Sequence, residues 1–122
     1  MRLNSDSPKS ILSKAFKCHS EGNTVSAAKY YQLFIDNDFH DPRVYSNYAV
    51  ILSQNLNVDK AIFLYKKSIK LFPNHQDAYS NLGNIFQRQG KYIEAKKLLQ
   101  KSIQLNSNRF EPHLNLGITL RK

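Results

Sequence analysis

The chain has 122 residues, 41% of them hydrophobic, and a formal net charge of +9, so it is long enough to bury one domain core. Apolar runs such as Ala49 to Leu52 are far shorter than the roughly 20 residues that a transmembrane helix needs, and the polar first residues lack a signal-peptide core. The single cysteine, Cys18, excludes an internal disulfide, and together these features predict a protein of the reducing cytoplasm without a membrane partner.

The predicted elements are helices from one end of the chain to the other. Ser7 and Asp41 are typical N-cap residues, and each precedes a proline, which is favoured at the first helical position. Gly22 and Gly90 mark places where a helix stops and the chain reverses, and Pro73 cannot continue a helix. These signals predict helices at residues 8–21, 24–37, 42–54, 58–71, 76–88, 92–105 and 110–121.

Three stretches of the chain superimpose without a gap at a spacing of 34 residues. Small and apolar residues carry this period: Ala15, Ala49, Gly83 and Gly117; Ala27, Ala61 and Ala95; and Ile35, Ile69 and Ile103. Such a period is typical of stacked supersecondary units, and it favours a binding scaffold over a catalyst. We therefore expect a polar tail at 1–7, units at 8–41, 42–75 and 76–109, and a single terminal helix at 110–122.

The segment from Ala78 to Asn108 resembles the tetratricopeptide repeat (TPR). The matching residues are Tyr79, Leu82, Gly83, Phe86, Gly90, Ala95 and Leu99, and 34 residues earlier Tyr45, Ala49, Leu52, Ala61, Tyr65 and Pro73. The resemblance implies an all-α fold, a right-handed α-solenoid of stacked helix-turn-helix units with about seven helices. In such a solenoid the first helices of the units line a concave, peptide-binding groove.

The units depart from the repeat pattern at a few places. The first unit has Lys14 where the third has Leu82, and Phe34 at the place of Ser68. The second unit has Leu56 instead of the mid-unit glycine. Such drift is expected of a terminal repeat that caps the stack.

Asparagine recurs at the sixth place of the units, as Asn47, Asn81 and Asn115. A similar ladder in the TPR solenoid of O-linked N-acetylglucosamine transferase holds peptide backbones, because an amide offers both a donor and an acceptor. The alternative is that these residues serve local helix contacts. The candidate peptide-binding residues are Asn47, Asn81, Asn115, Val50, Asn84 and Arg88.

The ladder alone is too weak to hold a peptide tightly. Three hydrogen bonds contribute roughly 1.5–4.5 kcal/mol, whereas association costs roughly 4–15 kcal/mol. Side chains of the partner therefore enter pockets near Val50, Ile118 and Leu12, or binding is weak, or the chain acts within a longer array.

Another groove of this family, the clamp for acidic C-terminal peptides in chaperone adaptors, uses lysine, arginine and asparagine at five places. Asn47 matches one of them. The other four places hold Leu12, Phe16, Asp77 and Asn81, which argues against this clamp.

The excess positive charge lies largely on the second helices of the units, at Lys29, Lys66, Lys67, Lys70, Lys97 and Lys101. We expect these lysines on a solvated convex surface, without exposed aromatic residues between them. Single-stranded nucleic acid favours aromatic platforms beside the cations, so nucleic acid is not the expected partner.

No pattern typical of catalysis occurs in the chain. His19, His40, His75 and His113 lack the close spacing of a metal site, and neither a nucleophilic triad nor a phosphate-binding loop is present. The sequence thus predicts no enzyme, no metal and no cofactor, and Cys18 is expected to pack against its neighbours.

The resulting hypothesis is a non-catalytic scaffold that binds an extended peptide segment. One alternative is an N-terminal targeting module of a larger glycosyl- or sulfotransferase-like enzyme, and another is a polyanion binder that acts through the convex lysines. The terminal helix is expected to cover the third unit as a lid, but the apolar residues Leu116, Ile118 and Leu120 also leave open a homodimer through this helix or a longer repeat protein.

Overall fold

The computed structural model describes residues 7–105, and these form helices joined by short turns. The helices are α1 (Pro8–Ser20), α2 (Thr24–Asp36), α3 (Pro42–Gln54), α4 (Val58–Leu71), α5 (Gln76–Arg88) and α6 (Tyr92–Leu105). The expected all-α fold is confirmed, and within residues 7–105 no strand occurs. The first two helices end one residue earlier than predicted, at C-caps Glu21 and Asn37. The helix predicted at 110–121 lies outside the described residues.

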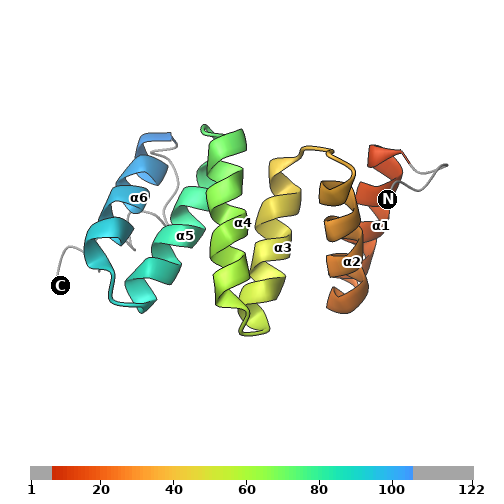
Figure 1. Cartoon of the computed structure of the whole chain (residues 1–122), viewed down its shortest axis with the longest axis horizontal. Helices are drawn as coiled ribbons and strands as arrows, with labels where there is room; N and C mark the ends of the chain where they lie inside the picture. Colours follow the sequence, from red (N-terminus) through yellow and green to blue (C-terminus); the bar gives the residue numbers. More distant parts are fainter. Residues whose placement is uncertain (1–6, 106–122) are drawn as a thin grey trace. The chain divides into compact units, whose positions relative to one another are not determined.

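Contacts divide the chain into two compact units, an N-terminal unit, Met1–Ala61, and a C-terminal unit, Ile62–Lys122. In the N-terminal unit α2 packs against both α1 and α3, and neighbouring helices run antiparallel (Figure 1). In the C-terminal unit α5 and α6 form an antiparallel pair. The boundary falls inside α4, so residues 62–71 of this helix belong to the C-terminal unit.

Side-chain caps start the first three helices. The Oγ of Ser7 accepts a hydrogen bond from the backbone N–H of Ser10 at 3.1 Å, and Oδ1 of Asn23 accepts one from Ser26 at 3.2 Å. Oδ1 of Asp41 accepts from the backbone N–H of Arg43 at 2.9 Å. Because the first N–H groups of a helix lack partners within it, each cap fixes a helix start.

Three turns between paired helices use a left-handed residue at the same place of the repeat. Gly22 and Gly90 have φ of +80°, where a residue without Cβ is favoured. Leu56 occupies the same place in the second unit with φ of +64°. Its side chain is 88% exposed, so no packing explains a leucine there.

Small residues lie where two helices approach closely. A Cβ added to Gly83 on α5 would lie 2.9 Å from Cδ2 and Cγ of Leu99 on α6. Ala95, one turn earlier on α6, is fully buried. The fully or almost fully buried large side chains include Tyr31, Tyr45 and Ile51 before the unit boundary, and Tyr65, Leu82 and Leu99 after it.

None of the helices in the described part of the chain has the length and apolar character needed to cross a membrane.

Candidate functional site

A depression of about 300 Å³ lies among the three helices of the N-terminal unit. Its lining combines one predicted binding residue with aromatic and polar side chains from α1, α2 and α3, namely Phe16, His19, Ser20, Tyr31 and Asn47. We call this depression the Asn47 pocket.

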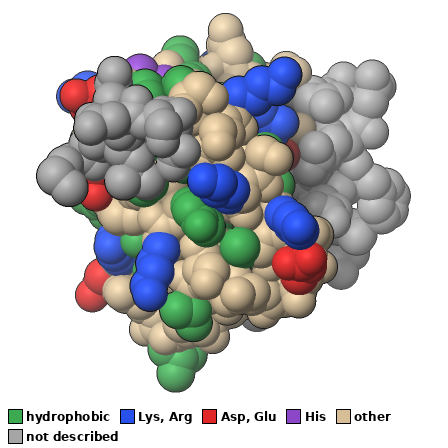
Figure 2. Space-filling model, turned by 90° about the vertical axis from the view of Figure 1, so that its right-hand side faces the viewer, with side chains coloured by type: hydrophobic (Ala, Val, Ile, Leu, Met, Phe, Trp, Pro, Cys, Tyr) green, Lys and Arg blue, Asp and Glu red, His purple; other side chains and the backbone are tan. Residues whose placement is uncertain are grey.

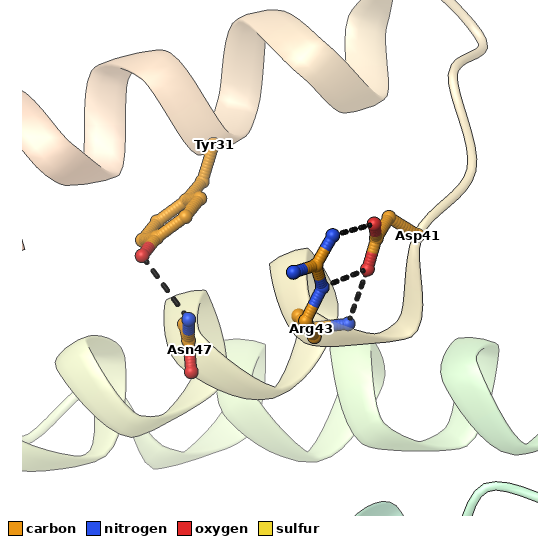
Figure 3. A network of polar contacts seen from close by, with 4 residues as sticks. All are labelled: Tyr31, Asp41, Arg43 and Asn47. Carbon is orange, nitrogen blue, oxygen red and sulfur yellow. Dashed lines mark hydrogen bonds and ion pairs between the residues drawn. The ribbon is translucent and has the colours of Figure 1, made fainter. Parts of the chain in front are cut away.

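A hydrogen-bonded chain of three side chains runs along the Asn47 pocket. The amide Nδ2 of Asn47 donates to Tyr31 Oη at 3.2 Å (Figure 3). Nδ1 of His19 lies 2.9 Å from the same hydroxyl. Because the Tyr31 oxygen accepts a hydrogen bond from Asn47, the hydroxyl hydrogen of Tyr31 is free to be donated to Nδ1 of His19. Burial raises the pKa of Tyr31, against the lowering effect of the bond from Asn47, so the phenol is neutral at neutral pH.

The amide of Asn47 is held in one orientation by this contact. Figure 3 shows Nδ2 pointing to Tyr31 and the amide oxygen pointing away from it. Within residues 7–105 this oxygen has no hydrogen-bond partner. The site therefore presents an oriented acceptor for an incoming N–H group.

The aromatic side of the pocket is supported by a fixed cation. The guanidinium carbon of Arg43 lies 5.0 Å from the ring centroid of Phe16, and the ring of Phe16 is tilted against that of Tyr31 at 6.2 Å. Asp41 binds Arg43 through both carboxylate oxygens, at 3.0 and 2.7 Å (Figure 3). Because the charge of Arg43 is paired with that of Asp41, the half-buried ring of Phe16 contributes apolar surface to the pocket.

The C-terminal unit contains a second tyrosine–asparagine pair at the same places of the repeat. Asn81 forms a hydrogen bond with Tyr65, and burial raises the pKa of Tyr65 to about 12 against the lowering effects of that bond and of Arg88. Tyr65 and Asn81 lie 34 residues after Tyr31 and Asn47. The repeated pair shows that these asparagines also make helix-to-helix contacts.

The other predicted site residues have different surroundings. Val50 is half-buried and belongs to the N-terminal unit, whereas Asn84 and Arg88 belong to the C-terminal unit. The amide oxygen of Asn84 is buried without a partner in the described part of the chain, and Arg88 is exposed. Asn115 and Ile118 lie outside the described residues.

Sequence reasoning missed Phe16, His19, Ser20 and Tyr31 as pocket residues. A usable signal existed for the tyrosine, because Tyr31 and Tyr65 share a place in the repeat, and each precedes an asparagine by 16 residues. His19 has no counterpart at its place in the other units, so the period does not single it out.

The predicted separation of lysines from exposed aromatics is wrong on α4. Phe63 is 62% exposed and lines a surface depression together with Lys66 and Lys67. Figure 2 shows the face of the molecule on the side of α1 and α2, where the Lys and Arg side chains are interspersed with side chains of other types.

Cys18 is half-buried on α1. Among residues 7–105, no group of three or more metal-ligating side chains is placed to hold an ion.

Comparison with known proteins identifies the repeats. Residues 42–75 and 77–109 match two sequence models of the tetratricopeptide repeat. The small glutamine-rich tetratricopeptide repeat-containing protein 2 of Mycosarcoma maydis is 32% identical over an alignment of 102 residues, and the match covers 78% of this chain. The matched region is 29% of that relative, so this chain spans less than a third of its length.

Two solved structures show the same fold. The first TPR of Spaghetti (RPAP3), bound to the HSP90 peptide SRMEEVD, has a TM-score of 0.86 at 22% identity, covering 99% of this chain and 96% of that one. The Sgt2 TPR domain from Aspergillus fumigatus has a TM-score of 0.80 at 20% identity, covering 98% of this chain and 80% of that one.

Proposed function

Because this chain belongs to the tetratricopeptide repeat family, we propose that it is a non-catalytic scaffold that binds an extended segment of a partner protein. The observation that carries the proposal is the oriented amide oxygen of Asn47, which has no hydrogen-bond partner among residues 7–105, in a pocket that Phe16 also lines. An extended peptide presents backbone N–H groups and side chains in alternation, and both find a complement in this pocket.

The tyrosine contact prepares Asn47 for binding. An amide that is already held by Tyr31 loses little side-chain freedom when a peptide arrives, so less of the interaction free energy is lost to ordering. One hydrogen bond contributes only about 1 kcal/mol, and therefore an apolar partner side chain must also be buried against Phe16.

The peptide should differ from the acidic one that the Spaghetti domain binds. In the peptide SRMEEVD two adjacent glutamates and a terminal aspartate call for cationic partners. At the places of the family's acidic-peptide clamp, this chain has Leu12, Phe16 and Asp77. We infer a preference for a neutral segment with a large apolar side chain.

The Mycosarcoma maydis relative is much longer than the region that matches this chain. Since the chain spans 29% of the Mycosarcoma maydis protein, we propose that it acts as the binding module of a longer protein in the cytoplasm. An enzyme-targeting module would use the same pocket and would differ only in the sequence attached to it.

The test is affinity capture from a nuclease-treated cell lysate, with retained proteins identified by mass spectrometry. The triple variant Asn47→Ala/Asn81→Ala/Asn115→Ala should lose the proteins that the wild type retains. Synthetic peptides from those proteins should then bind the wild type, and N-methylation of the peptide nitrogen that faces Asn47 should weaken binding about fivefold or more.

A matched variant separates peptide binding by the asparagines from their structural contacts between helices. Tyr31→Phe/Tyr65→Phe removes both hydroxyls that the asparagines contact and keeps the amides. If the amides bind peptide, this variant binds the partners more weakly than the wild type, because the amides are less fixed, but it still retains those that the triple alanine variant loses. Equal losses in both variants, at equal thermal stability, would reduce the asparagines to structural contacts and contradict the proposal.

A further inference from the structure

The exposed side of α4 in the C-terminal unit combines apolar and basic side chains. Phe63 is 62% exposed and Leu71 is 39% exposed, at opposite ends of a row of lysines. A depression of about 440 Å³ is lined by Phe63, Lys66, Lys67, Lys70 and Leu71. Large apolar side chains this exposed are typical of surfaces that contact a partner.

A second depression of about 320 Å³ adjoins the first, and Lys66 lines both. Its apolar lining comes from three helices of the C-terminal unit, through Ile69, Leu82, Phe86 and Leu98, and Lys66, Glu94 and Lys97 complete the lining. The Nζ atoms of Lys66 and Lys91 lie 5.9 and 5.4 Å from the ring centroid of Phe86. We call the two depressions together the α4 surface.

The cations of the α4 surface have no carboxylate partner in the part of the chain that the structure describes. Among residues 7–105, no ion pair involves Lys66, Lys67, Lys70, Lys91 or Lys97. Glu94 is the one acidic side chain in the lining of the two depressions. The surface is therefore a pair of apolar depressions bordered by excess positive charge.

We propose that the α4 surface binds an acidic segment of a partner protein that carries large apolar side chains. Apolar side chains of the segment would fill the two depressions, and its carboxylates would pair with the bordering lysines. Charge complementarity of this kind fixes the register of a partner and speeds association, while the buried apolar groups supply most of the affinity.

Other occupants fit this surface less well. A nucleic acid would satisfy the lysines, but its phosphates would leave the apolar lining unfilled. A second copy of the chain carries a net charge of +9, so it is repelled. Residues 106–122 contain Arg109, Arg121, Lys122 and Glu111, and this net positive segment does not complement lysines either.

The experiment measures fluorescence anisotropy of a labelled peptide made of alternating pairs of glutamate and of leucine or phenylalanine, at about 0.15 M ionic strength. Two probes serve for comparison: the same peptide with serine at every apolar place, and a labelled single-stranded oligothymidine. We expect the apolar acidic peptide to bind at least about tenfold more tightly than the serine peptide, because filling two depressions adds apolar burial.

Variants locate the binding. Lys66→Gln/Lys67→Gln/Lys70→Gln should weaken the apolar acidic peptide about tenfold. A control, Lys9→Gln/Lys17→Gln/Lys29→Gln, lowers the net charge equally through exposed lysines of the N-terminal unit and should leave binding unchanged. Phe63→Ser should weaken the same peptide about threefold or more. Asn47→Ala should have no effect, which separates this surface from the Asn47 pocket.

Three outcomes would overturn the proposal. Equal losses in the two lysine variants would mean attraction by net charge alone. Tighter binding of oligothymidine than of the apolar acidic peptide would make the surface a polyanion site. Absence of peptide binding by the wild type would mean that the α4 surface is closed to such a partner.

Discussion

Tyr31 and Tyr65 explain why asparagine suits the sixth place of the repeat. In each pair the amide contacts a phenol whose pKa is raised by burial, so the hydroxyl must be satisfied within the protein. At Asn47 the nitrogen serves the phenol, and the oxygen remains for a ligand. Aspartate would offer no donor to the phenol oxygen, and leucine would offer neither group. The third unit has Leu99 at the tyrosine place, so this contact is not repeated there.

The pKa of Tyr65 predicts a loss of stability at high pH. In the unfolded chain the phenol ionises near 10.0, whereas in the folded unit its pKa is about 12. Between these values the unfolded state has fewer protons, so the free energy of unfolding falls as pH rises, by about 2–3 kcal/mol in all. The stabilising effect is complete below about pH 10 and is lost by about pH 12. Urea unfolding across this range measures the loss.

Tyr65→Phe is the control for this prediction. Phenylalanine removes the ionising group while keeping the buried ring, so the variant should lose about 2–3 kcal/mol less than the wild type over the same pH range. The remaining decline of the variant reports the other groups that titrate there. Parallel pH curves for the two proteins would show that burial of Tyr65 does not control alkaline stability.

Gly83→Ala should destabilise the C-terminal unit by about 1–2 kcal/mol. Alanine improves helix propensity by about 1 kcal/mol, but its Cβ would lie 2.9 Å from two atoms of the fully buried Leu99. The cost of overpacking is therefore the larger effect. In a Leu99→Val background, which lacks the contacted Cδ2, Gly83→Ala should lower the free energy of unfolding by less. Urea unfolding of the wild type, the two single variants and the double variant measures this coupling between the two positions. Equal costs in both backgrounds would assign the effect to something other than the contact with Leu99.

At the scale of the elements, the turn between α3 and α4 stores strain at Leu56. A leucine in the left-handed region costs about 1–2 kcal/mol, and this side chain is 88% exposed, so little packing offsets the cost. Leu56→Gly should stabilise the protein by about 0.5–1 kcal/mol after the greater chain entropy of glycine is deducted. The reverse change, Gly90→Leu, should destabilise it by a similar amount, and thermal unfolding checks both. A decrease in stability for Leu56→Gly would mean that the leucine side chain has a packing partner.

The helices could be predicted from the sequence because their starts and stops are local. Ser7 and Asp41 cap helices through neighbouring backbone groups, and the period placed a turn at Leu56 without a glycine to mark it. The recurring spacing points to Tyr31 and Asn47 as a pair, but their contact depends on the register between α2 and α3, which the spacing alone does not determine. The exposure of Phe63 likewise depends on which face of α4 is covered, and apolar character alone indicates burial.

At the scale of the whole molecule, the net charge of +9 does not by itself select acidic partners. Charge attracts polyanions weakly from any part of a surface, whereas discrimination needs cations at fixed places. The lysines of the α4 surface border apolar depressions, and the places of the acidic-peptide clamp hold Leu12, Phe16 and Asp77 instead. This chain should therefore bind an acidic segment with large apolar side chains at the α4 surface, and it should bind an acidic C-terminal peptide of the clamp type only weakly.

The peptide SRMEEVD tests this distinction. The wild type should bind it weakly, because Asp77 repels its carboxylates and Leu12 offers no charge. Leu12→Lys/Asp77→Lys should strengthen binding by about tenfold or more, since two cations are added and one repulsive carboxylate is removed. Leu56→Lys/Asp59→Lys raises the net charge by the same amount, through one exposed turn residue and one exposed first-turn aspartate. Fluorescence anisotropy with labelled SRMEEVD should show the gain for the first variant only. The same gain in both would mean that net charge decides, and tight binding by the wild type would mean that this chain holds acidic C-terminal peptides through residues other than those at the clamp places.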